Sequence, residues 1–239
     1  MTSAALPLHA LAGFEASGYA RLDGRIVWQG EGAGAAHPRN ARQPWQAAPM
    51  RHDAQQLQRG AQRCLSLIEG LPAKGLLLWL AGQPLPFPLD LASARFDAIG
   101  AALQGHDVQA FETAALRVIG LGPGLTPSGD DFVGAILFAL AHAPRTDWPS
   151  GLPAVKARLA GAAAQRSNAI SAALLDDAMA GTSFRALHEM LLALHSERGP
   201  AITRAAQALL CVGASSGADM LAGLLLALHT RPDLQPLAP

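Results

Sequence analysis

The chain has 239 residues, of which 50% are hydrophobic and 15% are charged, so it can bury the core of one large domain or two small ones. Its 18 basic and 18 acidic side chains cancel. No positive excess remains to neutralise a nucleic-acid backbone or to bind an anionic membrane surface, so we expect neither as a partner.

The cellular location of the protein is inferred from its cysteines, its first residues and its apolar runs. Cys64 and Cys211 each lie within an apolar helical pattern, which predicts two buried thiols rather than a disulfide framework. Residues 1–14 contain no positive side chain and make a poor secretory signal. The longest apolar runs, residues 132–141 and 220–228, are too short to cross a bilayer. We therefore predict a soluble, cytoplasmic protein.

The first ninety residues predict a small β-containing part. Apolar residues flank Asp23-Gly24, a pair that favours the type I′ turn of a β-hairpin. Residues 30–49 predict a loop, residues 53–71 an amphipathic helix, and the apolar run 75–80 a buried strand. In this part Trp28, Arg39, Arg42 and Trp45 either line a cleft or only pack.

From residue 91 onward the pattern is helical almost throughout, with glycine or proline at most of the breaks. The predicted helices cover residues 98–103, 108–119, 132–142, 155–164, 169–180, 184–195, 201–211 and 220–229. We predict an α+β fold in which residues 1–90 form a small β-containing part packed on a larger helical part, residues 91–239.

The least ordinary stretch is the glycine-rich segment over residues 120–131. It contains these candidate substrate-binding residues: Gly122, Gly124, Thr126, Ser128 and Gly129. Glycines let the backbone approach a ligand, and Thr126 followed by Pro127 is a suitable N-cap and first helical residue. A helix starting here is expected to direct unpaired N–H groups and a partial positive charge at a small anion.

Two adjacent acids, Asp130 and Asp131, follow this helix start and are the candidate catalytic residues. One of them could act as a general base, or the pair could hold a divalent metal such as Mg²⁺. A purely structural alternative is that acids in the first turn complement the helix dipole, with Ser128 and Asp131 forming a capping box. The segment does not fit a dinucleotide-binding fingerprint, because Leu125 replaces the required small residue, and it lacks the lysine of a Walker A loop.

A second copy of this helix start lies near the C-terminus. The segment 216–228 aligns without gaps on 128–140 and repeats its Ser-Gly-x-Asp start. Either two buried helices use the same good cap, or two helix N-termini face one cleft. The second possibility adds Ser215, Ser216, Gly217 and Asp219 to the candidate substrate-binding residues. Arg166 and Asn168 could contribute charge and hydrogen bonds to the same anion, or only begin a helix.

These motifs together resemble the AllH family. The resemblance rests on the segment 120–131, on an Ile-Ser-Ala helix after Asn168, and on the segment 215–223, and it covers about residues 95–230. Val133-Gly134-Ala135 departs from the usual Leu-Ala-Gly of the family. The resemblance implies one subunit of oxamate carbamoyltransferase, which converts oxalurate and phosphate to oxamate and carbamoyl phosphate in purine and allantoin breakdown. It implies small anionic ligands and the other subunits of the transferase complex as partners.

Other functions remain to be weighed. Gly213–Gly217 has the Gly-x-Ser-x-Gly pattern of a hydrolase, but a helical pattern precedes it where a strand is required. His188-Glu189 begins a zinc-protease pattern whose second histidine is missing. The surviving alternatives are a non-catalytic, anion-binding partner or regulatory subunit, and a metal-dependent phosphate-handling enzyme of other specificity.

Overall fold

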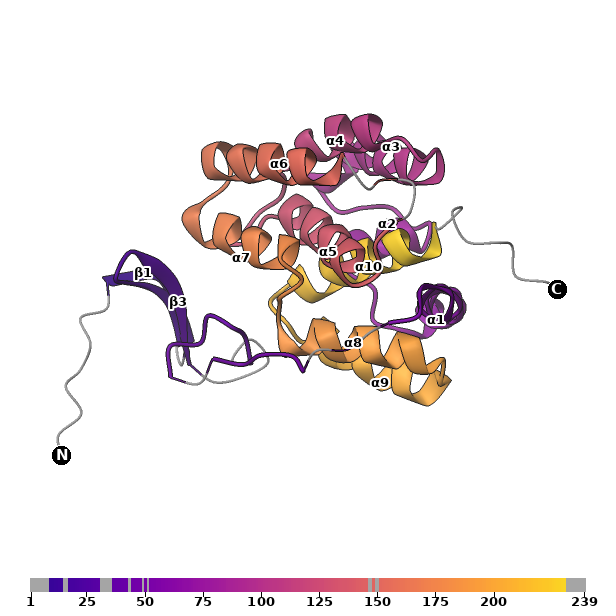
Figure 1. The fold of residues 1–239 in the computed structure, drawn as a ribbon, viewed down its shortest axis with the longest axis horizontal. Helices are drawn as coiled ribbons and strands as arrows, with labels where there is room; N and C mark the ends of the chain where they lie inside the picture. The colour runs from indigo at the N-terminus through magenta and orange to yellow at the C-terminus, as the bar shows by residue number, and fades with distance from the viewer. Residues whose placement is uncertain are drawn as a thin grey trace.

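A small sheet stands at one side of a larger helical body, which confirms the α+β class (Figure 1). The computed structural model describes residues 9–14, 17–30, 36–42, 44–48, 50, 52–145, 148 and 151–230. Residues 1–8 of the stretch tested for a secretory signal, and residues 31–35, 43 and 49 of the predicted loop, lie outside these ranges.

The sheet has three antiparallel strands in the order β1 (His9–Phe14), β2 (Ser17–Leu22) and β3 (Arg25–Gly30). Asp23 and Gly24 join β2 to β3 with φ angles of 48° and 76°. Both angles fall in the left-handed region that a type I′ turn requires. The predicted hairpin is therefore confirmed, and β1 adds a strand that the sequence pattern did not indicate.

Ten α-helices make up the rest of the described chain. They are α1 (Ala54–Leu67), α2 (Leu76–Leu80), α3 (Ser93–Gln104), α4 (Val108–Leu116), α5 (Ser128–His142), α6 (Leu152–Arg166), α7 (Ala169–Met179), α8 (Arg185–Ser196), α9 (Gly199–Leu210) and α10 (Ser216–His229). Two short 3₁₀ segments, Ile68–Gly70 and Leu89–Ala92, follow α1 and precede α3.

Three sequence expectations differ from the structure. The apolar run 75–80 forms the buried helix α2 instead of a strand, because a short apolar run has no periodicity that separates the two. The helical body begins at Ala54, and one core extends from Leu57 to Leu228 across the boundary predicted near residue 90. Cys64 is buried as predicted, but Cys211 is exposed because it caps the end of α9.

Helices α5 and α10 form the centre of the body, and nearly every residue of both is buried. They cross so closely that a Cβ at Gly223 would overlap the carbonyl oxygen of Phe132. Glycine at this crossing lets the two backbones touch, which sets the starts of both helices beside each other. Within the described residues, no helix combines the length and apolar character needed to span a bilayer.

The sheet is fastened to α7 by an apolar cluster and an ion pair. Tyr19, Trp28 and Ile170 form the buried cluster, and Leu125 of the glycine-rich loop packs against it. Arg39 binds both carboxylate oxygens of Asp177 at 2.5 and 2.8 Å and donates to the carbonyl of Ala173 at 2.9 Å. A bidentate pair of this kind fixes orientation as well as contact, so Arg39 is a packing residue.

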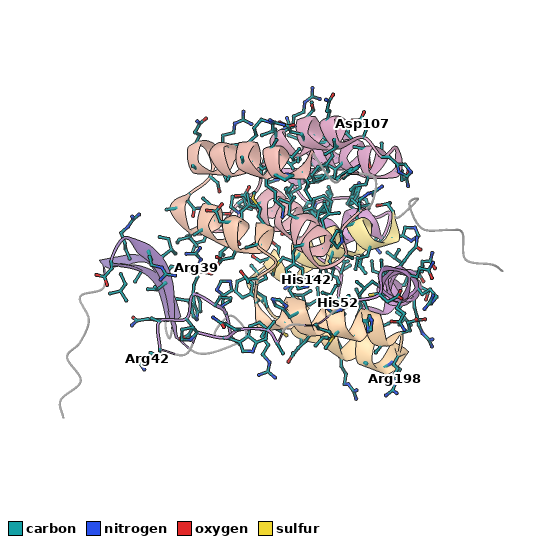
Figure 2. All side chains as sticks on the ribbon, viewed as in Figure 1. Arg39, Arg42, His52, Asp107, His142 and Arg198 are labelled. Carbon is teal, nitrogen blue, oxygen red and sulfur yellow. The ribbon has the colours of Figure 1, made fainter. Side chains whose placement is uncertain are left out.

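Four histidines meet where the segment before α1 crosses the body (Figure 2). His52 lies 5.4 Å from His142 and 5.5 Å from His195 between ring centroids, and His142 lies 5.4 Å from His188. Burial, followed by the neighbouring histidines, lowers the pKa of His52 and of His188 to about 4. The described residues contain no group of three His, Cys, Asp or Glu side chains placed to hold a metal ion, and this cluster is no exception.

The histidine cluster predicts loss of stability in mild acid. Because the folded-state pKa of His52 and His188 is lowered, the unfolded chain binds more protons below about pH 6.5. The free energy of unfolding should therefore fall as pH drops from about 6.5 towards 4. Urea unfolding near neutral pH and at about pH 5 measures this, and His188→Gln should reduce the difference. An unchanged difference in His188→Gln would contradict the role given to the cluster.

Candidate functional site

Helices α5 and α10 begin in the same way. The N–H of Gly129 donates to the carbonyl of Leu121 at 2.9 Å, and the N–H of Gly217 donates to that of Val212 at 2.9 Å. A Cβ at Gly129 would overlap the carbonyl oxygen of Val118, and a Cβ at Gly217 would overlap that of Leu209. The sequence repeat is therefore a structural repeat, in which the preceding helix end rests on the second residue of the new helix.

The starts of the two helices lie side by side and place hydroxyls around two carboxylates. The hydroxyls of Thr126 and of Ser216 in α10 lower the pKa of Asp131, and those of Ser215 and of Ser128 in α5 lower the pKa of Asp219. Each aspartate is thus close to the first serine of the opposite helix. Thr126 Oγ1 and Ser216 Oγ lie 2.7 Å apart, and the N–H of Leu76 at the start of α2 donates to Asp219 Oδ1 at 2.7 Å. The two helix starts therefore lie next to each other, and a shared ligand site remains a prediction.

These hydroxyls do not cap their own helices, which corrects the predicted capping. Helix α5 begins at Ser128 after Pro127 and has no side-chain cap, and α10 likewise lacks one. Thr126 reaches across to Ser216 instead of serving as the N-cap. The amides of Gly129, Asp130 and Asp131 bond to carbonyls of Leu121 and Pro127. The expectation that unpaired N–H groups of this turn receive an anion is therefore wrong for these three amides.

Asp131 and Asp219 form a buried carboxylate pair at the crossing. Burial raises the pKa of Asp131 well above its ordinary value, and the charge of Asp219 raises it further, against the effect of the Ser216 and Thr126 hydroxyls. Burial also raises the pKa of Asp219, which the Leu76 amide and the nearby hydroxyls oppose. The Oδ2 atoms of both side chains are buried without a hydrogen-bond partner. Such orphaned acceptors are uncommon in folded proteins and call for an explanation.

Asp130 has a different environment from its neighbour. Its Oδ1 accepts from the N–H of Gly120 at 2.6 Å, and its Oδ2 accepts from the hydroxyls of Ser167 and Ser171 at 2.5 and 2.6 Å. These three donors come from the glycine-rich loop, the α6–α7 connection and α7. Asp130 therefore positions the loop against α7, and Asp131 is the acid that keeps an oxygen available.

Arg166 and Asn168 also make structural contacts. Arg166 is exposed and donates to the carbonyl of Leu116 at 2.7 Å, at the end of α4. Asn168 caps α7 through the amides of Ile170 and Ser171, and its side-chain amide donates to the carbonyl of Leu125 at 2.7 Å. Both hold the segment that surrounds the site. Gly122 and Gly124 lie in the loop itself at φ angles of 115° and 101°.

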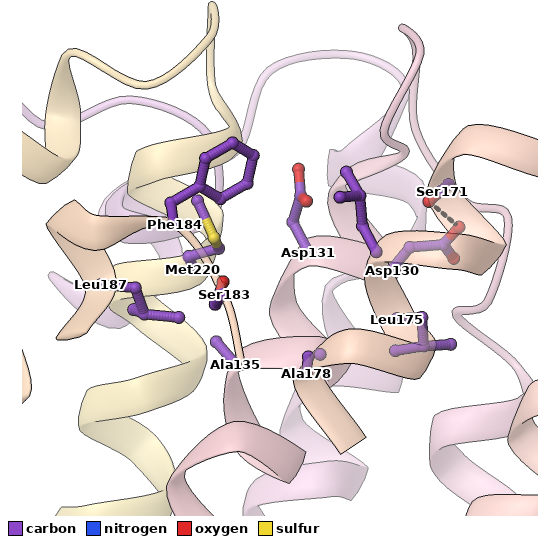
Figure 3. Close-up of a pocket in the computed structure, with 12 residues that line it drawn as sticks. Asp130, Asp131, Ala135, Ser171, Leu175, Ala178, Ser183, Phe184, Leu187 and Met220 are labelled. Carbon is purple, nitrogen blue, oxygen red and sulfur yellow. Dashed lines mark hydrogen bonds between the residues drawn. The ribbon is translucent and has the colours of Figure 1, made fainter. Parts of the chain in front are cut away.

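A pocket of about 330 Å³, part of it open to solvent, lies beside the carboxylate of Asp131 (Figure 3). Its wall is mostly apolar and comes from α5, α7, the start of α8 and α10. The lining includes Ala135, Leu175, Phe184, Leu187 and Met220. An apolar wall of this kind keeps water from the carboxylate and maintains its raised pKa.

Two residues of the first ninety approach the site, although the sequence pattern did not single them out. Lys74 lies near enough to Asp219 to lower the pKa of that carboxyl. Tyr19 is buried in the sheet, and its pKa is raised by burial and by the charge of Asp131. Their closeness depends on the tertiary packing of α2 against α10 and of the sheet against α7. No local pattern in the sequence indicated either position.

The fold and site together define a helical protein in which two equivalent helix starts bury a pair of acids among hydroxyls. A model of the AllH family, described as oxamate carbamoyltransferase subunit AllH, matches residues 118–228. The match confirms the resemblance inferred from the motifs and includes both helix starts. No curated protein and no solved structure matches the chain.

The close approach at Gly217 predicts a large effect of a single methyl group. Gly217→Ala should lower the free energy of unfolding by about 1–3 kcal/mol, because the new Cβ overlaps the carbonyl of Leu209 and α10 must shift. Gly161→Ala in α6 is the matched control, because a Cβ there meets nothing within 4 Å. The higher helix propensity of alanine should raise the free energy of unfolding of this variant by about 0.5–1 kcal/mol. Urea unfolding of both variants checks the prediction, and equal effects would refute the close contact.

Proposed function

We propose that the chain is an AllH-like subunit of an oxamate carbamoyltransferase and that it binds a small anionic substrate beside Asp131 and Asp219. The reaction joins oxalurate and phosphate with oxamate and carbamoyl phosphate, in cytoplasmic purine and allantoin breakdown. The observation that carries the proposal is the position of the buried carboxylate pair, with its unpartnered Oδ2 atoms, inside the segment that matches the family model.

The reaction sets clear requirements on such a site. In the direction from oxalurate, a phosphate oxygen attacks the carbamoyl carbon, the bond from that carbon to the oxamate nitrogen breaks, and this nitrogen takes up a proton. Every reactant is an anion, so the site must hold negative charge near the reacting carbon. It must also exclude water, which would otherwise hydrolyse the carbamoyl group.

Asp131 is the acid placed to act on such a substrate. Its Oδ2 is unpartnered, whereas both oxygens of Asp130 accept hydrogen bonds. The candidate catalytic pair is therefore revised from Asp130 and Asp131 to Asp131 and Asp219, with Asp130 as a positioning residue. The hydroxyls of Thr126, Ser128, Ser215 and Ser216 lie close to these carboxylates and are available to a substrate oxygen.

Lys74 provides part of the positive charge that two carboxylates and an anionic substrate require. It lies at the start of α2, close enough to Asp219 to influence its pKa. An ammonium group on a flexible stem can follow a phosphate or carboxylate oxygen into the site. The first ninety residues thus contribute directly to substrate binding, through Lys74 and through the cover formed by Tyr19.

The test measures carbamoyl phosphate formation from oxalurate and phosphate by the chain assembled with its partner subunits. Lys74→Gln should raise the KM for the anionic substrate about tenfold, which corresponds to ~1.4 kcal/mol of lost interaction. Asp131→Asn should abolish turnover while the complex remains assembled. The exposed Arg204 provides a control, because Arg204→Gln removes a cation from α9 and should change neither value.

The outcomes separate the proposed enzyme subunit from a non-catalytic partner. Undiminished turnover in Asp131→Asn and Lys74→Gln would place the chemistry in another subunit. Loss of assembly with either variant would favour a regulatory or scaffolding role for this chain.

A further inference from the structure

We propose that Asp131 and Asp219 hold one divalent cation of the hard, oxygen-preferring kind, Mg²⁺ or Mn²⁺, where the starts of α5 and α10 meet. This inference deepens the proposed function by naming how the anionic substrate is tolerated next to two acids. It rests on the geometry of the pair and does not require that the reaction be carbamoyl transfer.

The first support is the pair of unpartnered oxygens. Asp219 is 0% exposed and Asp131 is 9% exposed, and the Oδ2 atom of each lacks a hydrogen-bond partner. Leaving a buried charged acceptor unsatisfied costs more than an ordinary hydrogen bond contributes. A protein rarely keeps two such atoms at one place unless something else satisfies both of them. One cation between the carboxylates would do so.

The second support is the chemistry of the surrounding donors. The groups close to the two carboxylates include the hydroxyls of Thr126, Ser128, Ser215 and Ser216, so the side chains that could ligate a cation here offer oxygen atoms. Among the described residues there is no set of three His, Cys, Asp or Glu side chains that could form a closed metal cage. This combination argues against zinc and suits Mg²⁺, which is commonly bound by one or two carboxylates, keeps several waters and takes substrate oxygens as further ligands.

The third support is the balance of charge. Asp131 and Asp219 are like charges in a buried site, and Asp130 and the Tyr19 hydroxyl add no positive charge. Lys74 is close enough to lower the pKa of Asp219 and supplies positive charge on that side of the pair. Adding a phosphate or a carboxylate to this site would therefore leave an excess of negative charge. A divalent cation removes the excess and bridges the acids to the substrate anion.

The helix starts do not provide a direct anion site in place of the cation. The amides of Gly129, Asp130 and Asp131 bond to loop carbonyls, and those of Gly217, Ala218 and Asp219 bond to the carbonyls of Val212 and Ser215. The amides of the second, third and fourth residues of both helices are thus occupied and do not face an anion. An anion at this crossing needs a positive ligand, which the cation supplies.

The test titrates the full chain with Mn²⁺ and follows binding by electron paramagnetic resonance, with Mg²⁺ as competitor. We expect one Mn²⁺ per chain, displaced by Mg²⁺, with a dissociation constant below about 1 mM. Asp131→Asn and Asp219→Asn should each weaken binding by at least about tenfold. The exposed Asp90 gives a matched control, since Asp90→Asn should bind Mn²⁺ as the unchanged chain does.

A thermal melt with and without Mg²⁺ guards against variants that merely misfold. In the presence of a chelator, Asp131→Asn should melt above the unchanged chain, because it removes like-charge repulsion from a buried pair. Saturating Mg²⁺ should raise the melting temperature of the unchanged chain and not that of the variant. Folded Asn variants that bind Mn²⁺ with undiminished affinity, or an unchanged chain that binds none, would overturn the cation site. The carbamoyl-transfer assay is independent of both results, so each proposal can fail alone.

Discussion

The close approach of the starts of α5 and α10 is the contact on which the rest of the structure depends. Thr126 Oγ1 and Ser216 Oγ lie 2.7 Å apart, and Ser216 lowers the pKa of Asp131 as Ser128 lowers that of Asp219, so each helix start forms part of the environment of the other. Glycines allow this closeness, at Gly223 where the helices cross and at Gly129 and Gly217 where each preceding helix rests on the new one. Serines that would normally cap their own helix are used across the interface instead. The two helix starts therefore share one polar centre, and neither helix has a side-chain N-cap of its own.

Burying two acids in an apolar core is unfavourable, and the surroundings show how the fold compensates. Asp130 is fully hydrogen-bonded and fixes the glycine-rich loop to α7, so the loop that carries Thr126 is rigid. The pair of Arg39 with Asp177 holds the sheet over the same region and brings Tyr19 near Asp131. These contacts keep Asp131 and Asp219 buried with raised pKa values. Strongly shifted pKa values occur most often at functional sites, where the shifted group acts on a ligand.

Much of this could be predicted from the sequence, because the decisive signals are local. The Asp23-Gly24 hairpin, most helices and the repeated Ser-Gly-x-Asp start depend on residues close in the chain. The alignment of the repeat even distinguishes the two acids: Asp131 falls on Asp219, whereas Asp130 falls on Ala218. The remaining features depend on contacts between residues far apart in the chain, which the sequence pattern does not reveal. No pattern near residue 75 reveals that α2 is a helix, or that Lys74 and Leu76 meet an aspartate of α10. The bonds from Arg166 to the carbonyl of Leu116 and from Asn168 to that of Leu125 likewise depend on which carbonyls lie opposite them.

The different hydrogen bonding of Asp130 and Asp131 affects which ions the site can bind. Had Asp130 and Asp131 both been first-turn acids that complement the helix dipole, each would sit near free amides and need no partner. Instead, the amides of Gly129, Asp130 and Asp131 are bonded to carbonyls, Asp130 accepts from three donors, and Asp131 retains a buried oxygen without a partner. A site with occupied amides and unsatisfied acids attracts positive charge before it attracts negative charge. Under the proposed function, an anionic substrate would meet Lys74 and a cation held by the acids, and the paired helix starts would contribute geometry rather than the binding charge itself.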